Sequence, residues 1–364
     1  MHRAPFPSRT AIVHDFFVTE GGAERVAIEL ASMFPDADVY TSFFDARRFG
    51  GRLDPARVHP WPAQRLVGPT RRFRSLLPLY PAWFSLLDLR RYDLVISSSV
   101  AFTHAVRTSA GARHLAYVHT PMRYAWDLDR YLAGSSAGLA SRVGGRLARA
   151  PLQRWDRWAA GRPDVLVANS RTVQERIRRR WGRESAVVYP PVDVDEIQPG
   201  DRDDGFLLVA ARLLRYRRVD LVVAAATRLG RDLVVVGDGP ELASLRAAAG
   251  PTVRFEGFVP RARLVELMRT CSAYLVPGVE DFGIAPVEAM AAGKPVVAYG
   301  RGGAAETVVD GETGILVPEQ SVDAVCAALE RLGSARLDPA AARARAAQFD
   351  ASVFRSAIRQ LVER

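Results

Sequence analysis

Two glutamates separated by seven residues form a pair that could bind a polar ligand. Glu280 lies in a loop that we expect after a strand, and Glu288 lies in an early turn of the helix expected next. In open α/β sheets, ligands bind beyond the carboxyl ends of the strands. Carboxylates at that edge suit sugar hydroxyls, and the backbone N–H groups at a helix start suit phosphate. The residues that would supply those N–H groups are Phe282, Gly283, Ile284 and Ala285. Two solvated surface glutamates are an equally simple interpretation.

An arginine-rich loop follows another expected strand. In ARLLRYRRVDL (211–221), Arg212 and Arg217 are separated by four residues, and Arg218 lies beside them. Two cations at a junction of strand, loop and helix can hold a diphosphate and neutralise it as it leaves. The chain contains a single lysine, Lys294, and uses arginine almost everywhere else. A solvated arginine loop is therefore the alternative.

Glycine pairs mark two turns between an expected strand and an expected helix. Gly237 and Gly239 in LVVVGDGPEL resemble a dinucleotide fingerprint, but Leu242 stands at the third glycine position, so the signal for NAD is weak. Gly21 and Gly22 follow the first strand, where paired glycines allow close backbone approach to a ligand. A plain tight turn would use the same residues.

A histidine ends one expected strand of the first half. His119 stands in YVHTPMRYAWD (117–127), at the same edge of the sheet as the first glycine pair. Its position suits contact with a ligand, although a lone histidine at a strand end more often has a structural role.

Short β-branched runs alternate with helical patterns along the whole chain, which is typical of parallel sheets in an α/β fold. The clearest helical patterns cover residues 22–33, 171–181 and 351–363, the last with Val353, Ala357, Ile358 and Leu361 on one face. The expected strands are residues 10–13, 38–41, 94–97, 115–119, 165–168, 186–189, 206–210, 233–236, 253–255, 273–276, 296–298 and 314–317.

A Pro-, Asp- and Gly-rich stretch at residues 189–205 reads as a linker. We therefore predict two doubly wound domains. The first covers residues 1–195, joined by a returning helix within 349–364, and the second covers residues 196–348.

Composition excludes several classes of protein. Hydrophobic residues make up 48% and charged residues 25%, both ordinary for a globular chain. No apolar run reaches the roughly 18–20 residues of a membrane span. Two distant cysteines cannot build a disulfide framework or a zinc knuckle. We expect a cytoplasmic protein without a signal peptide.

The net charge of +10 belongs to the first half of the chain. Residues 1–196 hold 29 basic and 19 acidic side chains, whereas residues 197–364 hold 21 of each. Such a surplus predicts an anionic partner: a nucleic acid, a membrane surface or a phosphorylated acceptor. No nucleic-acid recognition motif accompanies the charge, so we expect no nucleic acid, with a basic nucleic-acid-binding protein as the non-enzymatic alternative.

Taken in order, the motifs resemble the family 4 retaining glycosyltransferases of GT-B fold, especially the mannosyltransferase-like branch of bacterial surface-polysaccharide pathways. The resemblance spans nearly the whole chain and is carried by HDFFVTEGGAERV, SSSVAFTHAV, YVHTPMRYAWD, VANS, YPPVD, RLLRYRR, VVGDGPE, FEGFV and EDFGIAPVEAM. It implies two Rossmann-like domains facing a central cleft, with a nucleotide-sugar held mainly by the second.

The resemblance also implies roles for single residues. Glu288 would bind the ribose hydroxyls and Glu280 the hydroxyls of the donor sugar. Arg212 and Arg217 would bind the diphosphate, although the family usually has lysine where this chain has Arg217. His119 would lie near the transferred hexose. The remaining donor-binding positions would be Gly21, Gly22, Gly237, Gly239, Phe282, Gly283, Ile284 and Ala285.

The activity implied is transfer of a hexose with retention, without a metal ion or other cofactor. GDP-mannose is the expected donor and a UDP-sugar the alternative. The acceptor would be a lipid-linked sugar or another glycan. A nucleotide-sugar epimerase or a phosphorylase remains possible, because both also use two Rossmann-like domains.

One segment suggests where the protein works. RRFRSLLPLYPAWFSLL (71–87) interleaves Arg71, Arg72 and Arg74 with the apolar residues Phe73, Leu76, Leu77, Tyr80, Trp83 and Phe84. Such a pattern suits peripheral docking on an anionic membrane leaflet. The alternative is that the apolar side chains belong to the core of the first domain.

Overall fold

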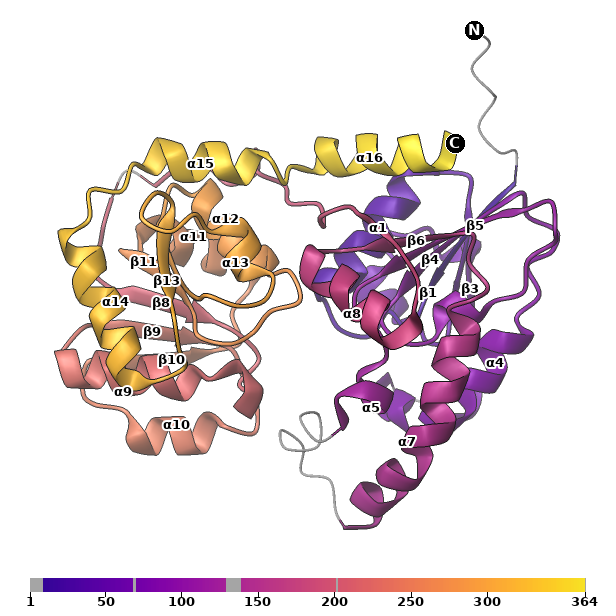
Figure 1. Ribbon diagram of the computed structural model, residues 1–364, viewed down its shortest axis with the longest axis horizontal. Helices are drawn as coiled ribbons and strands as arrows, with labels where there is room; N and C mark the ends of the chain where they lie inside the picture. The colour runs from indigo at the N-terminus through magenta and orange to yellow at the C-terminus, as the bar shows by residue number, and fades with distance from the viewer. Residues whose placement is uncertain (1–8, 68–69, 129–138, 201, 364) are drawn as a thin grey trace, which may run out of the picture. The chain divides into compact units, whose positions relative to one another are not determined.

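The computed structural model describes residues 9–67, 70–128, 139–200 and 202–363. These residues form two compact units (Figure 1). Unit 1 contains the described residues up to 128, residues 139–191 and residues 354–363, and unit 2 contains residues 192–353. The chain therefore leaves unit 1 after Pro191 and returns to it at Phe354.

Unit 1 is built on a parallel sheet of seven strands in the order β3-β2-β1-β4-β5-β6-β7. Its central strands β1 and β4 are buried along their whole length, as expected for strands covered on both faces. The short edge strand β3 was not predicted, because three residues ending in Pro60 carry too little pattern. The seven strands are Thr10–His14, Asp38–Thr41, Val58–Pro60, Leu94–Ser99, Arg113–Val118, Val165–Ala168 and Ala186–Val187.

Helices cover both faces of this sheet. On one face α1 and α16 pack against Ile12, Ile96 and Tyr117. On the other face the core includes side chains of α4, α7 and α8. The helices of unit 1 are α1 (Gly22–Met33), α2 (Ala46–Phe49), α3 (Gln64–Val67), α4 (Tyr80–Leu86), α5 (Arg123–Trp126), α7 (Leu139–Ala159), α8 (Arg171–Trp181) and α16 (Ala351–Glu363).

Three helices begin and end where the sequence predicts, and local signals explain why. In α8, the Ser170 side chain accepts a hydrogen bond from the Val173 N–H, and Gly182 ends the helix in the left-handed conformation. The predicted bounds of α1 and α16 are confirmed as well. Of the four residues predicted for the apolar face of α16, Ile358 is buried and Ala357 and Leu361 pack against the core, and only Val353 was misplaced. The buried side chains of α16 are Phe354, Ile358 and Val362, whereas Val353 is 49% exposed.

Unit 2 contains a parallel sheet of six strands in the order β10-β9-β8-β11-β12-β13. One face of the sheet packs against α9 and α14 through a continuous aliphatic core. The strands are Leu207–Ala210 (β8), Leu233–Val236 (β9), Val253–Gly257 (β10), Ala273–Val276 (β11), Val296–Tyr299 (β12) and Gly314–Val317 (β13). The helices are α9 (Val219–Leu229), α10 (Leu242–Ala248), α11 (Arg261–Thr270), α12 (Ile284–Ala291), α13 (Ala304–Thr307), α14 (Val322–Ser334) and α15 (Pro339–Ala347).

The stretch predicted as a linker is largely part of unit 2. The Val192 N–H donates to the Phe349 carbonyl at 3.1 Å, and the Ala351 N–H donates to the Val192 carbonyl at 3.1 Å. Val192, Val194 and Ile197 are buried. These hydrogen bonds connect the outgoing and returning chain segments beside the unit boundary.

Candidate active site

Each sheet has one place where its strand order reverses. In unit 1, β1 and β4 lie side by side, with β2 and β3 beyond β1 and with β5, β6 and β7 beyond β4. In unit 2, the corresponding pair is β8 and β11. The loops beyond the carboxyl ends of such strands diverge, which leaves room for a ligand. Most of the candidate residues lie in these loops.

Arg217 and Glu280 form the central ion pair of unit 2. Arg217 belongs to the 3₁₀ turn Arg215–Arg217 after β8, and Glu280 lies after β11. The guanidinium donates to the Glu280 carboxylate, and both side chains are about one-fifth exposed, at 22% and 21%. The two residues meet because their loops follow β8 and β11, which are neighbours in the sheet. A half-hidden pair of this kind presents both a cation and a carboxylate to one ligand.

The neighbouring arginines have other environments. Arg212 is exposed. Arg218 has a left-handed backbone with φ of 54°, and its Nε atom lies 3.1 Å from the Asp220 carboxylate at the start of α9. This ion pair turns the Arg218 side chain toward its own helix. Among the four arginines of the loop, Arg217 is the one that donates to Glu280.

Three glycines that the sequence analysis did not select allow the loops to pack this closely. A Cβ atom on Gly278 would lie 2.7 Å from the Arg217 carbonyl oxygen, and one on Gly303 would lie 2.2 Å from the Phe282 Cα atom. Gly302 has φ of 84° and contacts the Glu280 backbone. The paired glycines in the Arg301-Gly302-Gly303 sequence after β12 are the feature that could have identified Gly302 and Gly303 from sequence.

The start of α12 offers backbone donors beside this pair. Gly283 precedes the helix with φ of 94°, and no side chain caps it. The first N–H groups of an α-helix have no partner within the helix, and they favour an anion. Here they belong to Ile284 and Ala285. Phe282 is buried and packs on Phe349, with their ring centroids 5.6 Å apart, so this residue can offer only its backbone.

Glu288 lies one turn further along α12 and is almost fully buried. Its Oε1 atom is 2.8 Å from a guanidinium nitrogen of Arg261, the first residue of α11, whose side chain is 37% exposed. Burying a carboxylate is costly unless a cation and hydrogen bonds compensate it. Sequence reasoning did not find Arg261, because 26 residues separate it from Glu288 and no local pattern relates them.

Gly237 and Gly239 have a structural reason in this fold. A Cβ atom on Gly237 would lie 2.0 Å from the Ala211 carbonyl oxygen, and one on Gly239 would lie 2.3 Å from the Leu213 carbonyl oxygen. The Leu213 N–H also donates to the Asp238 carbonyl at 2.9 Å. The two glycines therefore let the loop after β9 support the arginine loop after β8.

In unit 1 the glycine pair begins α1. Gly21 precedes the helix and Gly22 is its first residue. Glu24, at the third helical position, accepts hydrogen bonds from the backbone N–H groups of Gly21 and of Glu24 itself. A glutamate at this position that reaches back to the residue before the helix is half of a capping box. A Cβ atom on Gly21 would lie 2.7 Å from the Glu24 Oε2 atom, so the carboxyl group needs the glycine.

The buried Glu24 carboxyl group predicts a pH-dependent stability. Burial raises its pKa from 4.5 to about 8, against the opposing effect of the two N–H groups. Below pH 4.5 the carboxyl group is protonated in both folded and unfolded chains, and above pH 8 it must ionise inside the fold. Glu24→Gln should therefore match the wild type at low pH and become more stable as the pH rises. We expect the gain above pH 8 to be on the order of 5 kcal/mol.

Urea unfolding of both proteins from pH 5 to pH 9 measures this difference. The matched control is Glu20→Gln, because Glu20 lies on the surface in the same loop and pairs with Arg52. Its stability difference should stay small over the whole range. A Glu24→Gln difference that does not change with pH would contradict the assignment.

A buried aspartate fixes the loop after β4. Asp15 is fully buried and accepts hydrogen bonds from the N–H groups of Val100, Ala101 and Phe102 at 2.6, 3.2 and 2.8 Å. Burial raises its pKa to about 6, and the three N–H groups counteract part of that effect. Asp15 thus connects the ends of β1 and β4, the two strands at the reversal point. In the sequence, the position of Asp15 directly after the first strand was the feature that could have identified it as a residue of this edge.

His119 follows β5 and is buried. Its Nε2 atom lies 2.9 Å from the Ser98 hydroxyl oxygen, and its ring lies edge-on to that of Tyr117 with centroids 5.3 Å apart. His119 therefore lies at the carboxyl edge of the sheet, next to the loops after β1 and β4. The glycine pair and His119 belong to the same edge of unit 1, as the sequence predicts.

Several apolar side chains of the segment predicted to dock on a membrane pack against the core of unit 1. Tyr80 and Phe84 are fully buried, and Phe73, Leu76, Leu77 and Trp83 pack against the same core of unit 1. The side chains of Arg71, Arg72 and Arg74 lie outside the described residues. Leu79 and Leu86 of the same segment are 53% and 68% exposed, and its docking on a membrane stays a prediction. Within the described chain, no helix has the length and apolarity needed to span a membrane.

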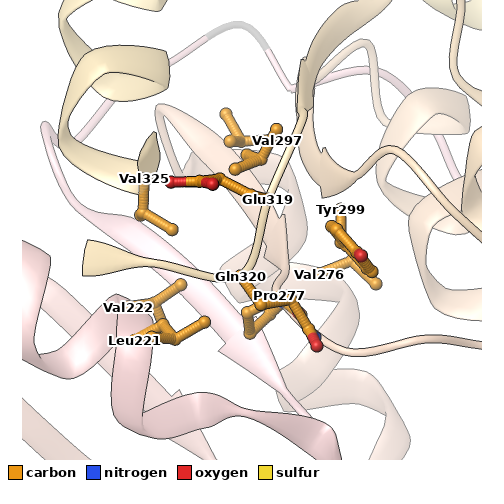
Figure 2. Close-up of a pocket in the computed structure, with 10 residues that line it drawn as sticks. Leu221, Val222, Val276, Pro277, Val297, Tyr299, Glu319, Gln320 and Val325 are labelled. Carbon is orange, nitrogen blue, oxygen red and sulfur yellow. The ribbon is translucent and has the colours of Figure 1, made fainter. Parts of the chain in front are cut away.

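Two hollows of unit 2 differ in size and in place. Figure 2 shows a cavity bounded by Leu221, Val276, Val297 and Tyr299, among other residues. Its volume is about 10 Å³, which is about the size of one water molecule. A polar hollow of about 400 Å³ lies near Phe206 and Asp232, which precede β8 and β9. The small cavity adjoins Pro277 and Tyr299, where the loops after β11 and β12 begin, whereas the polar hollow lies before β8 and β9.

Comparisons with known proteins show the family and the fold. Residues 20–196 match the family model described as Glycosyltransferase Family 4, and residues 194–349 match that of Glycosyl transferases group 1. The D-inositol 3-phosphate glycosyltransferase of Mycobacterium avium (strain 104) is 34% identical over 191 residues, which cover 46% of this chain and 45% of the relative. That of Kribbella flavida is 32% identical over 206 residues, 47% and 48% of the two chains. The match thus spans about half the length of these curated relatives.

The fold extends further than the sequence match. HepE from Anabaena, solved in complex with UDP-glucose, superposes with a TM-score of 0.70 at 20% identity, and the alignment covers 97% of this chain and 99% of that one. The two family models together span residues 20–349. The chain is therefore a family 4-like protein of the GT-B glycosyltransferase fold.

Proposed function

We propose that the protein transfers a hexose from a nucleoside diphosphate sugar to an acceptor hydroxyl. One observation carries the proposal: a cation, two carboxylates and the uncapped start of a helix come together at the reversal point of the sheet in unit 2. Arg217 contacts Glu280, Glu288 is buried one turn into α12, and the N–H groups of Ile284 and Ala285 begin that helix.

These groups match the parts of such a donor. Glu288 would accept hydrogen bonds from ribose hydroxyls, and Glu280 would accept them from the hexose. Arg217, with Arg212, would neutralise the diphosphate as it leaves, together with the helix start. On this view the protein positions its substrates and stabilises the leaving group, so that neither a metal ion nor another cofactor is needed. Retention of the anomeric configuration is part of the proposal.

The donor is proposed in two forms. The sequence resemblance favours GDP-mannose. The similar structure of HepE is a complex with UDP-glucose, which favours a UDP-hexose. The two donors differ in base as well as in sugar, so a panel of nucleotides separates them.

The acceptor is proposed to be anionic. The positive surplus of residues 1–196 favours a phosphorylated or lipid-linked acceptor and contact with an anionic membrane surface. The names of the curated relatives, D-inositol 3-phosphate glycosyltransferases, agree with a phosphorylated acceptor. Any contact of the protein with a membrane through the segment 71–87 would be electrostatic, because most of its apolar side chains belong to the core.

A donor panel tests the function. GDP, UDP, ADP and their sugars are added separately, and the ligand that binds most tightly should raise Tm most. With that donor, release of the nucleoside diphosphate should require an acceptor, and EDTA should leave the rate unchanged. Release without an acceptor would indicate hydrolysis, and product formation without release would indicate an epimerase. A strict need for a divalent metal would contradict the arginine site.

A further inference from the structure

Helix α12 carries one charged residue in a stretch that is otherwise apolar. Residues 286–291 are all buried, and the sequence of this stretch is Pro-Val-Glu-Ala-Met-Ala. The charged residue is Glu288, which is 3% exposed. Well-packed apolar side chains are often as stabilising as a buried ion pair, or more so. The stability of the fold therefore does not explain why a carboxylate stands at this position.

The carboxylate is held by a residue of another helix. Arg261 Nη2 lies 2.8 Å from Glu288 Oε1, and Arg261 is the first residue of α11. α11 follows β10 in the chain, whereas α12 follows β11, and β9 and β8 lie between those two strands in the sheet. Both helices begin beyond the carboxyl ends of their strands. The ion pair thus connects two helix starts at the edge of the sheet where a ligand is expected.

The guanidinium of Arg261 is only partly satisfied by this contact. Its Nη1 atom is buried and has no hydrogen-bond partner within the described part of the chain. A buried N–H group without an acceptor lowers the stability of a fold. The guanidinium is also planar, and its N–H groups point in fixed directions, so that it restricts the rotation of a carboxylate bound to it. The pair is therefore better suited to orienting Glu288 than to stabilising the protein.

Tyr274 of β11 shows where the carboxylate lies. Burial, and to a lesser extent the charge of Glu288, raise the pKa of this buried tyrosine well above its ordinary value. Its hydroxyl group donates its single proton to the Ala210 carbonyl at 2.9 Å, at the end of β8. The proton is thus already used, and the phenol does not hold Glu288. The carboxylate lies beside β8 and β11, the two strands at the reversal point of the sheet.

We propose that Arg261 is a positioning residue that holds the Glu288 carboxylate in the direction in which it accepts hydrogen bonds from the ribose hydroxyls of a nucleoside diphosphate. Arg261 acts through Glu288 and does not itself contact the nucleotide. A carboxylate that is already oriented loses less conformational freedom when the ligand binds. The inference rests on the proposed function for its ligand, whereas the ion pair itself does not.

Isothermal titration with UDP and GDP, and with the 2′-deoxy form of the one that binds more tightly, tests this role. The wild type should prefer the ribonucleotide, because a ribose hydroxyl reaches Glu288. Arg261→Leu should weaken binding of the ribonucleotide roughly 10-fold and bring the preference for ribose toward one, as Glu288→Leu does. Adding Arg261→Leu to Glu288→Leu should cause no further loss, because Arg261 acts through the carboxylate.

Arg263→Leu is the matched control. Arg263 lies two residues further along α11 and pairs with Glu256 and Glu266, each at 3.0 Å. This variant should keep the affinity and the ribose preference of the wild type. A further loss when Arg261→Leu is added to Glu288→Leu would indicate direct contact with the nucleotide and would overturn the positioning role. An unchanged ribose preference in Arg261→Leu would overturn it as well.

Urea unfolding tests the ion pair without a ligand and shows that each variant is folded. Both single variants should be less stable than the wild type, because each leaves the other charge without its partner. The double variant should recover most of this loss and still bind the nucleotide as weakly as Glu288→Leu. Additive losses of stability would show that the two side chains are not coupled and would overturn the inference. If the wild type binds neither UDP nor GDP, the proposed function fails and the positioning role fails with it, whereas coupling in stability alone would leave the ion pair standing.

Discussion

Arg217→Ala should lower kcat by about 10²-fold or more, the usual cost of removing one group that stabilises a developing anion. Arg217 is the arginine of its loop that contacts Glu280, and it is only 22% exposed, so that solvent screens its charge less than that of a surface arginine. Arg217→Lys keeps the charge but not the planar fork of donors. We therefore expect this variant to retain much of the activity. Steady-state kinetics with saturating donor measures both effects.

The matched control for this prediction lies two residues earlier. Arg215 belongs to the same 3₁₀ turn and is exposed, so Arg215→Ala should stay near the wild-type rate. Near-normal turnover by Arg217→Ala, together with a large loss in Arg215→Ala or Arg218→Ala, would transfer the role to that arginine. Loss of nucleotide binding in every variant would instead indicate a general electrostatic effect.

Glu288→Ala should weaken binding of the nucleoside diphosphate roughly 10- to 100-fold, which corresponds to about 1.5–3 kcal/mol for hydrogen bonds to a charged group. The carboxylate is buried against Arg261, and its removal also leaves that guanidinium without its partner. Glu288→Gln preserves the shape of the side chain and should show a smaller loss. Isothermal titration with the nucleoside diphosphate measures the affinity independently of turnover.

Glu280→Ala is the counterpart of this variant, because Glu280 is expected to contact the hexose. It should reduce kcat more than nucleotide affinity, since a misplaced hexose affects the transition state. The two glutamates therefore separate by readout: affinity for Glu288 and turnover for Glu280. Small and equal effects of both substitutions on binding and on rate would contradict the assignment of the site.

The local features of the fold could be predicted from sequence. Helices α1, α8 and α16 have the predicted bounds, since the 3.6-residue period and nearby caps decide where a helix begins and ends. The twelve predicted strands are all present within a few residues, because buried parallel strands are short apolar runs between turns. Edge strand β3 was missed because its three residues are too few to show an alternation of apolar and polar side chains.

The positions of Glu280 and Arg217 could also be expected, because each follows a buried strand in the sequence. That they form an ion pair depends on β8 and β11 being neighbours in the sheet, and the order of strands is not a local property. The same holds for Arg261 and Glu288, which belong to different helices. The apolar residues of the segment 71–87 were ambiguous in sequence, and only their packing against the sheet placed them in the core.

By itself the sequence therefore determined the α/β class, the strands and helices, and the edge of each sheet at which polar residues gather. Only the tertiary structure decided the partners of those residues. Ser98 lies 84 residues from His14 and 21 from His119, and the three meet because β1, β4 and β5 pair side by side. A strand's own sequence fixes which of its residues are buried. The hydrogen-bond partners of His119 depend on which strands lie beside β5, and strand order is settled only when the whole sheet has formed.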